Sequence, residues 1–282
     1  IQQAADIMVA GDTVIVHEGV YREWVKPQNG GCAEHKRITY MAAEGEHVEI
    51  TGAEEITDWE LVEGSVYKTV INNEFFGDYN PYTKRVHGDW WCGPFDYDVH
   101  TGDVYLDGLS AYEAASVEDV MHPTKRLEYV YDPNCKGAKL PHPENTVYQW
   151  RAVVDDDTTT IYVNFNDKKP ETTKVKINVR QSVLYPIKTG LDYITVKGFE
   201  LSCAATWYAP PTGDQVGLIG PHWAKKWIIE DCDIHDSKCS AVSLGKEAST
   251  GDNLCTRTGR KPGYTYQMEA VFLARNIGWS KE

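Results

Sequence analysis

This sequence of 282 residues contains no C-x-x-C pair of cysteines and no apolar segment long enough to cross a membrane. The seven cysteines are odd in number and form no C-x-x-C pair, and a chain of this length does not depend on a disulfide framework. We therefore predict reduced cysteines, most of them buried as small apolar side chains, in a cytoplasmic setting. No stretch approaches the roughly 20 consecutive apolar residues of a transmembrane helix, so we expect no membrane partner. Because the chain begins at Ile1 rather than at a Met, it carries no information on a leader peptide.

Positive charge is also scarce, with 28 Lys and Arg against 42 Asp and Glu and a formal net charge of −14. Binding to phosphates depends on Lys and Arg, so this balance argues against nucleic acid and against anionic membranes as partners. Among polysaccharides it favours neutral ones over polyanions, although one local basic groove would override that preference.

Sequence signatures of cofactor and metal sites are missing as well. The sequence holds no P-loop, no dinucleotide-binding fingerprint, no zinc-ligand spacing and no Ser/His/Asp arrangement, so we expect no cofactor. The acidic group Asp231, Asp233 and Asp236 leaves two alternatives open, a calcium site whose ligands come from several segments and a pair of catalytic carboxylates. Hydrogen bonds at a chain corner explain the group more simply, and we expect no bound metal.

Aromatic residues are plentiful and unevenly distributed, with nine Trp and seventeen Tyr but only six Phe. Trp and Tyr combine an apolar face with a polar group, which suits stacking on a sugar ring. Aromatic side chains are also common in β-strands for packing reasons alone, so composition by itself favours neither explanation.

Short β-segments with glycine at their corners follow a helical pattern at the N-terminus. Apolar residues at helical spacing over positions 1–8 predict a short amphipathic helix that caps one end of the following structure. Strands are predicted at 13–16, 37–41 and 47–52, and a further strand begins near 19–21. Because no helical pattern separates these strands, the first part of the chain is predicted to be β-rich.

A repeat with an offset of 33 residues is the most informative feature of the sequence. The run 194–201 is echoed by 227–234, and apolar residues coincide at 194/227, 196/229, 199/232 and 201/234. Repeats of this length indicate solenoids or similar arrays, and a unit of strand, corner and strand predicts a β-solenoid with an inward apolar stack. The pattern resumes at 241–244 and at 270–273.

A different pattern occupies the middle of the chain. Apolar and polar residues alternate over 161–165 and over 175–179, which is typical of antiparallel sheet with one buried face. We therefore predict an all-β fold in which a parallel β-solenoid is interrupted by a sandwich-like antiparallel insertion. The expected segments are an N-terminal cap with the first coils at 1–56, the insertion at 57–181, and resumed coils, incomplete at the C-terminus, at 182–282.

Four stretches together resemble the β-xylosidases of glycoside hydrolase family 120. They are residues 11–23, 88–91, 215–223 and 236–247. The first stretch is common in β-helix proteins, whereas the last two are more specific. The resemblance implies a right-handed parallel β-helix with an inserted immunoglobulin-like domain, and retaining hydrolysis of short β-1,4-xylo-oligosaccharides.

The resemblance also implies substrate-binding roles for Trp91, Gln215, His222, Trp223 and Glu247. Loops on a rigid scaffold commonly carry such contacts. Simpler alternatives stay open, because His222 could bind a backbone carbonyl, Trp223 could cover the core and Glu247 could pair with a neighbouring basic residue. A loop over 251–264 carries basic residues and could serve substrate entry or subunit contact.

The catalytic residues are expected outside this sequence. Enzymes of this family place an Asp nucleophile and a Glu acid/base on coils that follow the matched region, and the chain stops at Glu282 directly after a predicted strand. We therefore expect both carboxylates beyond residue 282.

Two other classes remain open, a β-helix polysaccharide lyase and a non-catalytic β-helix that binds carbohydrate. The expected partner is a xylo-oligosaccharide, and association into a homo-oligomer is left open.

Overall fold

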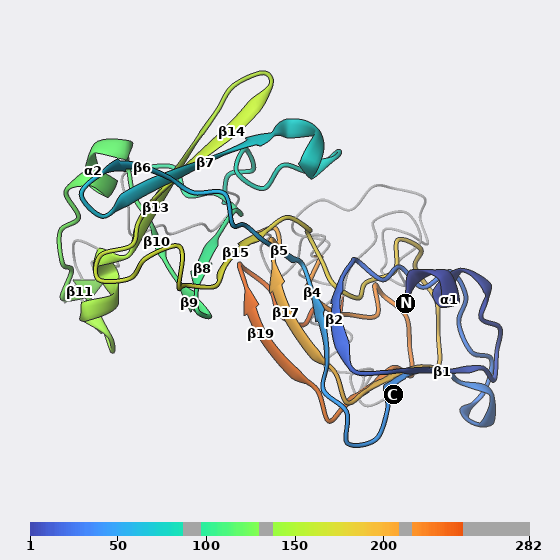
Figure 1. Ribbon diagram of the computed structural model, residues 1–282. Coiled ribbons are helices and arrows are strands. Elements are labelled where there is room, and N and C mark those ends of the chain that lie inside the picture. The colour runs from blue at the N-terminus through green and yellow to red at the C-terminus, as the bar shows by residue number, and fades with distance from the viewer. Residues whose placement is uncertain (87–96, 130–137, 209–215, 245–282) are drawn as a thin grey trace, which may run out of the picture. The chain divides into compact units, whose positions relative to one another are not determined.

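The computed structural model describes residues 1–86, 97–129, 138–208 and 216–244. The chain divides into two compact units, which we call unit 1 (Ile1–Gly52 with Arg180–Glu282) and unit 2 (Ala53–Val179). The described residues form mainly β-strands with a few short helices (Figure 1), so the predicted all-β class is confirmed. The predicted domain limits at residues 57 and 181 stay a prediction.

Helix α1 (Gln2–Ile7) packs on the core of unit 1. Its residue Ala5 and the following Met8 are buried together with Val16 and Ile38. The apolar residues at helical spacing therefore form one face of α1, and this face packs on a β-rich core as the sequence suggested.

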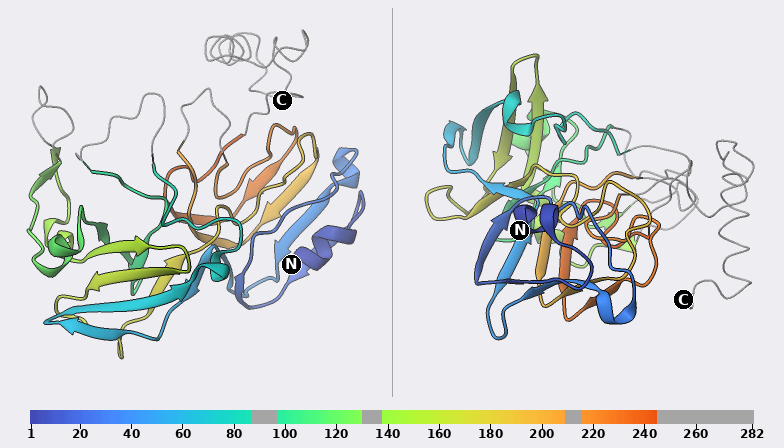
Figure 2. Two further views of the ribbon diagram at one scale, coloured as in Figure 1. Left: turned by 90° about the horizontal axis from the view of Figure 1, so that it is seen from above. Right: turned by 90° about the vertical axis from the view of Figure 1, so that its right-hand side faces the viewer.

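Two four-stranded sheets in unit 1 are built entirely from parallel pairs (Figures 1 and 2). The first sheet contains, in spatial order, β1 (Thr13–Val16), β3 (Ile38–Ala42), β16 (Ile194–Lys197) and β18 (Ile228–Glu230). The second contains β2 (Gly19–Arg22), β4 (Val48–Thr51), β17 (Glu200–Ala204) and β19 (Asp233–Ser237), with β2 and β19 at its edges. Each strand of the first sheet is followed along the chain by one of the second, and we call each such pair a pass.

A third row of parallel contacts joins the same passes. Single bridges connect Val25 to Leu184, Leu184 to Ile219, and Ile219 to Val242. The side chains of Val25, Leu184 and Ile219 are fully buried, so this row completes the apolar core that the two sheets begin. Because the same face of each pass meets the core, the register of all three rows is fixed by burial.

The repeat of 33 residues corresponds to two passes that lie side by side in register. Val196 pairs with Ile229 in the first sheet, and Leu201 pairs with Ile234 in the second. The corners match as well, since Gly198 and Asp231 both adopt left-handed backbone angles, with φ of 77° and 54°. The predicted stacking of these two segments is therefore confirmed.

Unit 2 contains two larger sheets, which are mainly antiparallel. The first has the order β10-β13-β14-β7-β6, with bounds Tyr112–Glu113, Gln149–Val154, Thr158–Asn164, Val66–Asn72 and Glu60–Glu63. The second has the order β5-β15-β8-β9, with bounds Ala53–Glu55, Val175–Asn178, Val104–Leu106 and Leu109–Ser110. Smaller elements are the hairpin β11 (Glu128–Tyr129) and β12 (Ala138–Lys139), helix α2 (Val117–Met121), and 3-10 helices η2 (Asn73–Phe76) and η3 (Pro143–Val147).

The two larger sheets of unit 2 share one apolar core. Ile161 and Val163 of β14 and Trp150 of β13 pack with Ile177 of β15 and Leu106 of β8. The two alternating runs seen in the sequence are therefore strands of different sheets, and their inward residues meet in this core.

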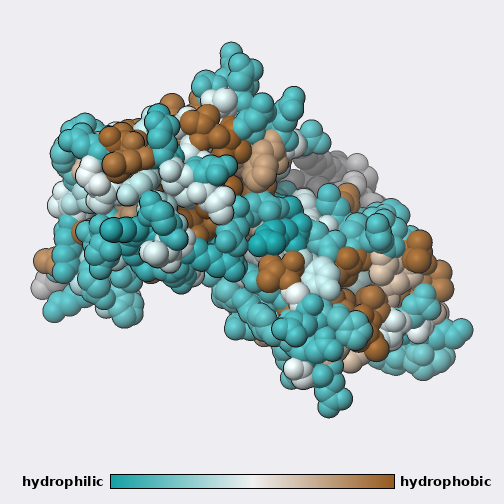
Figure 3. Space-filling view, viewed as in Figure 1, coloured by the Kyte–Doolittle hydropathy of each residue, from teal (hydrophilic) through white to brown (hydrophobic). Residues whose placement is uncertain are grey.

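The surface in Figure 3 is predominantly hydrophilic, with separate apolar patches. Among the described residues, no helix has both the length and the apolar character that crossing a membrane requires.

The hydroxyl of Tyr40 generates a first prediction, because it is buried in the core of unit 1 without a hydrogen-bond partner. Burial, and secondarily the charge of Asp6, raises the pKa of Tyr40 far above its ordinary value. An unpaired buried hydroxyl costs free energy, so Tyr40→Phe should raise the free energy of unfolding by about 1 kcal/mol. The matched control Tyr82→Phe removes a hydroxyl that donates to the Asp103 carbonyl at 2.9 Å and should lower it by about 1 kcal/mol. Urea unfolding measures both changes, and a loss of stability in Tyr40→Phe contradicts the assignment.

Candidate functional site

Three loops that follow the third row of bridges lie against one another in unit 1. We call residues 26–37, 186–193 and 221–227 the loop stack. The amide of Gly31 donates to the carbonyl of Asp192 at 2.8 Å, and the amide of Tyr193 donates to the carbonyl of Lys225 at 3.1 Å. The parallel register of the passes therefore continues into the loops that leave them.

Arg37 ties the loop stack to the adjoining strand β16. Its guanidinium donates to the Thr195 hydroxyl at 2.8 Å, to the Ile194 carbonyl at 3.1 Å, and to the carbonyl of Lys226. A further contact at 2.8 Å pairs it with Glu34 at the start of the 3-10 helix η1 (Glu34–Lys36). A planar group with five donors can make these contacts at once, so Arg37 holds three passes together.

His222 has a defined orientation within the loop stack. Its Nδ1 lies 2.8 Å from the carbonyl oxygen of Pro186, and its ring lies 5.1 Å from the ring of Tyr185 at an interplanar angle of 32°. A carbonyl oxygen can only accept, so in the neutral ring Nδ1 carries the hydrogen and Nε2 keeps a lone pair. The arrangement leaves His222 able to accept a hydrogen bond at Nε2, for example from a hydroxyl group.

Trp223, which follows this histidine, and Trp24, which is bonded to the Tyr185 backbone, are further aromatic side chains of unit 1. The backbone amide of Trp223 donates to the carbonyl of Leu244 at 2.6 Å, and its side chain is partly exposed. Trp24 donates from Nε1 to the Tyr185 carbonyl at 3.0 Å and lies under the ammonium of Lys26 at 4.4 Å. Sugar rings stack on partly exposed faces of this kind.

The backbone before His222 passes very close to the next pass of the chain. A Cβ atom at Gly220 would lie 1.8 Å from the carbonyl oxygen of Ser243, and one at Gly217 would lie 2.8 Å from the amide nitrogen of Ser243. The Gly217 amide also donates to the Ser243 hydroxyl at 2.9 Å. Only glycine fits at both positions, which explains the glycine spacing that precedes His222.

Asp231 lies at the corner before β19, whereas Asp236 lies within that strand. Asp231 lies 3.3 Å from the ammonium of Lys197, and Asp236 accepts from Nδ1 of His235 at 2.7 Å. Within the described part of the chain, no three His, Cys, Asp or Glu side chains are arranged to hold a metal ion. These contacts favour the corner explanation over a pair of catalytic carboxylates.

Histidine and glutamate side chains connect three passes on the outer face of the second sheet. Glu200 accepts from His47 at 2.6 Å and from His235 at 3.1 Å. Partial burial of His235 disfavours its charged form, but hydrogen bonds to Asp236 and Glu200 outweigh this and raise its pKa above the ordinary value. The charged form of His235 therefore contributes to stacking of the passes.

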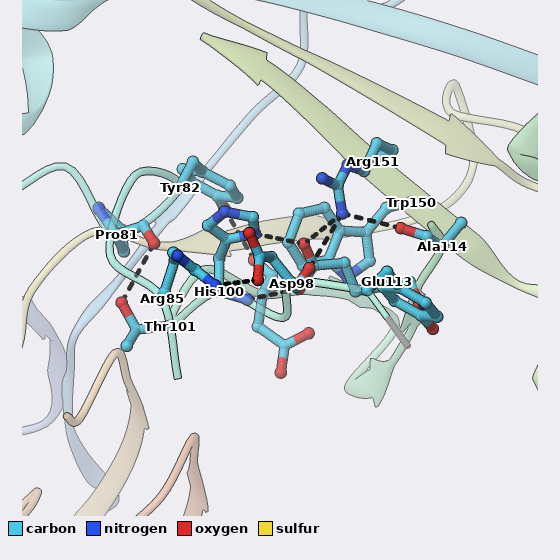
Figure 4. Close-up of polar contacts among 12 residues, drawn as sticks. Pro81, Tyr82, Arg85, Asp98, His100, Thr101, Glu113, Ala114, Trp150 and Arg151 are labelled. Carbon is cyan, nitrogen blue, oxygen red and sulfur yellow. Dashed lines mark hydrogen bonds and ion pairs between the residues drawn. The ribbon is translucent and has the colours of Figure 1, made fainter. Parts of the chain in front are cut away.

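Unit 2 holds a buried charged group that the sequence did not indicate (Figure 4). The carboxylate of Glu113 is almost fully buried and accepts from the His100 amide at 2.7 Å, from His100 Nδ1 at 2.6 Å and from Arg151 at 3.1 Å. Arg151 also donates to the Ala114 carbonyl at 3.0 Å. Through these contacts the Glu113 carboxylate joins β10 to β13.

The structure brings together two of the five predicted site residues, His222 and Trp223. Trp91, Gln215 and Glu247 lie outside the described residues. Sequence reasoning missed Tyr185 and Trp24, because their contact with the site depends on pairing between distant segments.

Removing a glycine tests the close approach at Gly220. Gly220→Ala should lower the free energy of unfolding by about 3 kcal/mol, because its Cβ would overlap a backbone carbonyl. The control Gly198→Ala has a positive φ, but its nearest neighbour is the Ala42 Cβ at 3.4 Å, so only the backbone strain of about 1 kcal/mol is expected. Equal costs in chemical denaturation would contradict the packing described.

Titration of His235 gives a prediction on pH. Because its pKa is raised in the folded protein, its stabilising effect is complete below the ordinary value of about 6.5 and is lost as the pH rises through the folded value. The free energy of unfolding should therefore fall as the pH rises above about 6.5, and less so in His235→Gln. The control His122→Gln alters an exposed pair with Glu118 in unit 2 and should leave the slope unchanged. A slope that His235→Gln does not reduce would refute the assignment.

Comparison with known proteins places the chain in a family. Residues 56–177 match the family model described as glycoside hydrolase 120, insertion domain. The complex structure of XylC with xylose is 53% identical, with a TM-score of 0.87, and the match covers 99% of this chain and 44% of that chain. The chain therefore spans less than half the length of XylC.

Other comparisons add little. A structure described as a glycoside hydrolase is 11% identical with a TM-score of 0.40, over 78% of this chain and 54% of that chain, which is too distant to carry an argument. Curated protein sequences give no match. Because residues 56–177 match the insertion domain and 99% of this chain aligns with XylC at 53% identity, the chain belongs to glycoside hydrolase family 120.

Proposed function

We propose that the protein containing this chain is a retaining β-xylosidase that releases xylose from short β-1,4-xylo-oligosaccharides. The observation that carries the proposal is the 53% identity to XylC, whose structure was solved with xylose. The net charge of −14 is compatible with a neutral sugar as substrate.

We further propose that unit 1 is a right-handed parallel β-helix and that unit 2 is an inserted immunoglobulin-like domain. Support for the helix comes from three rows of parallel contacts that join successive passes in register. Support for the insertion comes from two mainly antiparallel sheets around one core and from the family model over 56–177.

His222 and Trp223 are proposed as substrate contacts, with the same role for Trp91, Gln215 and Glu247. The lone pair on Nε2 of His222 suits a sugar hydroxyl as donor, and the indole of Trp223 suits the face of a xylose ring. These two residues sit where Gly217 and Gly220 hold the backbone against the next pass.

The nucleophile and the acid/base are proposed to be an Asp and a Glu outside these 282 residues. Retaining glycosidases need two carboxyl groups about 5–5.5 Å apart. The acidic residues Asp231 and Asp236 are engaged with Lys197 and His235, and XylC is longer than the region matched here.

A cytoplasmic location is proposed on the state of the cysteines. Cys32, Cys203, Cys232 and Cys239 are free thiols, and burial raises the pKa of Cys239 to about 11. Of these four, Cys203 is buried, Cys232 and Cys239 are partly buried, and Cys32 is exposed; an exposed free thiol suits a reducing compartment. Association into a homo-oligomer stays an open proposal.

The proposal is tested on the full protein with xylotriose, by proton NMR of the released sugar. Retention predicts that the β-anomer of xylose forms first and then equilibrates. Products that absorb in the ultraviolet, formed from a uronate-containing polysaccharide assayed in parallel, would indicate a lyase, and binding of xylotriose without turnover would indicate a non-catalytic protein; either result contradicts the proposal.

The role of His222 is tested by His222→Asn, which keeps a donor near Nδ1 for the Pro186 carbonyl but removes the Nε2 acceptor. We expect kcat/KM to fall about tenfold, the value of one hydrogen bond, with thermal stability nearly unchanged. His142→Asn, on an exposed histidine of unit 2, is the control and should change neither quantity. Unchanged kcat/KM in His222→Asn would remove His222 from the site.

A further inference from the structure

Basic side chains concentrate on the loop stack although the chain as a whole is acidic. Its three loops carry two carboxylates, Glu34 and Asp192, against six cationic residues, Lys26, Lys36, Arg37, Lys188, Lys225 and Lys226. The rest of the chain is therefore more negative than the total of −14. Three segments that are far apart in the sequence combine to make this basic surface.

Several of these charges are already engaged. Arg37 pairs with Glu34, Lys26 lies over Trp24, and the Asp192 carboxylate accepts from the backbone amide of Lys225 at 2.7 Å. Lys36 and Lys188 are exposed, and no ion pair involves either side chain among the described residues. The loop stack therefore keeps unneutralised positive charge at its surface.

The same loops carry the proposed xylose contacts. His222 and Trp223 belong to the third loop, and the carbonyl that orients His222 belongs to Pro186 of the second loop. A ligand whose sugar ring meets His222 and Trp223 would thus lie against a loop that also carries Lys188, two positions after Pro186. We propose that the loop stack binds the carboxylate of a uronic acid substituent on a xylo-oligosaccharide, while His222 and Trp223 bind the neutral backbone.

The overall charge restricts the kind of anion that this surface can accept. A long polyanion would meet the negative remainder of the chain, whereas repulsion of a short ligand is screened beyond a Debye length of about 8–10 Å. A single carboxylate on a short neutral oligosaccharide is attracted by the nearby lysines and avoids most of the repulsion from the distant acidic residues. This inference rests on the proposed function, and it extends the substrate class from neutral to singly carboxylated xylo-oligosaccharides.

The test compares xylotriose with xylotriose that bears one glucuronic acid group, using the full protein at about 0.1 M and about 0.5 M salt. At low salt the decorated substrate should have a KM about fivefold lower, since exposed charge pairs contribute little individually. The double variant Lys36→Glu/Lys188→Glu should abolish this difference and leave the KM of neutral xylotriose unchanged, and high salt should also abolish it. Lys125→Glu makes the same charge reversal on an exposed lysine of unit 2 and should preserve the difference.

The outcomes separate this inference from the proposed function. Turnover of neutral xylotriose without any advantage for the decorated substrate, or an advantage that the double variant retains, overturns the inference alone. If neither substrate is turned over, the proposed function fails, and calorimetric binding of the two oligosaccharides to parent and double variant then decides the inference. Equal binding of inorganic phosphate or heparin at the same lysines would show a general anion site and would also overturn it.

Discussion

Parallel hydrogen bonding between successive passes is the constraint on which the rest of unit 1 depends. Val25, Leu184 and Ile219 meet in one buried row although 158 residues lie between the first two and unit 2 occupies most of that interval. Once this row is in register, the loops that leave it must also stack, because each starts from an equivalent position. Gly217 and Gly220 permit the close approach to Ser243 that this register imposes.

Electrostatics divides unit 1 into surfaces of different character. On the outer face of the second sheet, Glu200 accepts hydrogen bonds from His47 and His235. The negative charge of Glu200 is therefore balanced locally, by an amount that depends on histidine protonation and hence on pH. On the loop stack, Lys36 and Lys188 keep their charge at the surface. An acidic protein can thus present a local attraction for a carboxylate, because interactions at contact distance are screened less than those across the molecule.

The sequence predicted those parts of the fold that repeat or alternate locally. The offset of 33 residues correctly paired Val196 with Ile229, and the spacing over 1–8 correctly identified α1. Contacts set by long-range pairing could not be predicted: Tyr185 against His222, the three-loop basic surface, and the buried Glu113 with Arg151. No local pattern marks these residues, since each becomes significant only when distant strands are in register.

Hydrogen–deuterium exchange of the full protein with and without xylobiose tests the central claim most directly. If the loop stack is the sugar-binding surface, the ligand should slow exchange in residues 186–193 and 221–227, and leave β13 and β14 unchanged. Slower exchange confined to the outer face of the second sheet, or to unit 2, would contradict the account and place the sugar elsewhere.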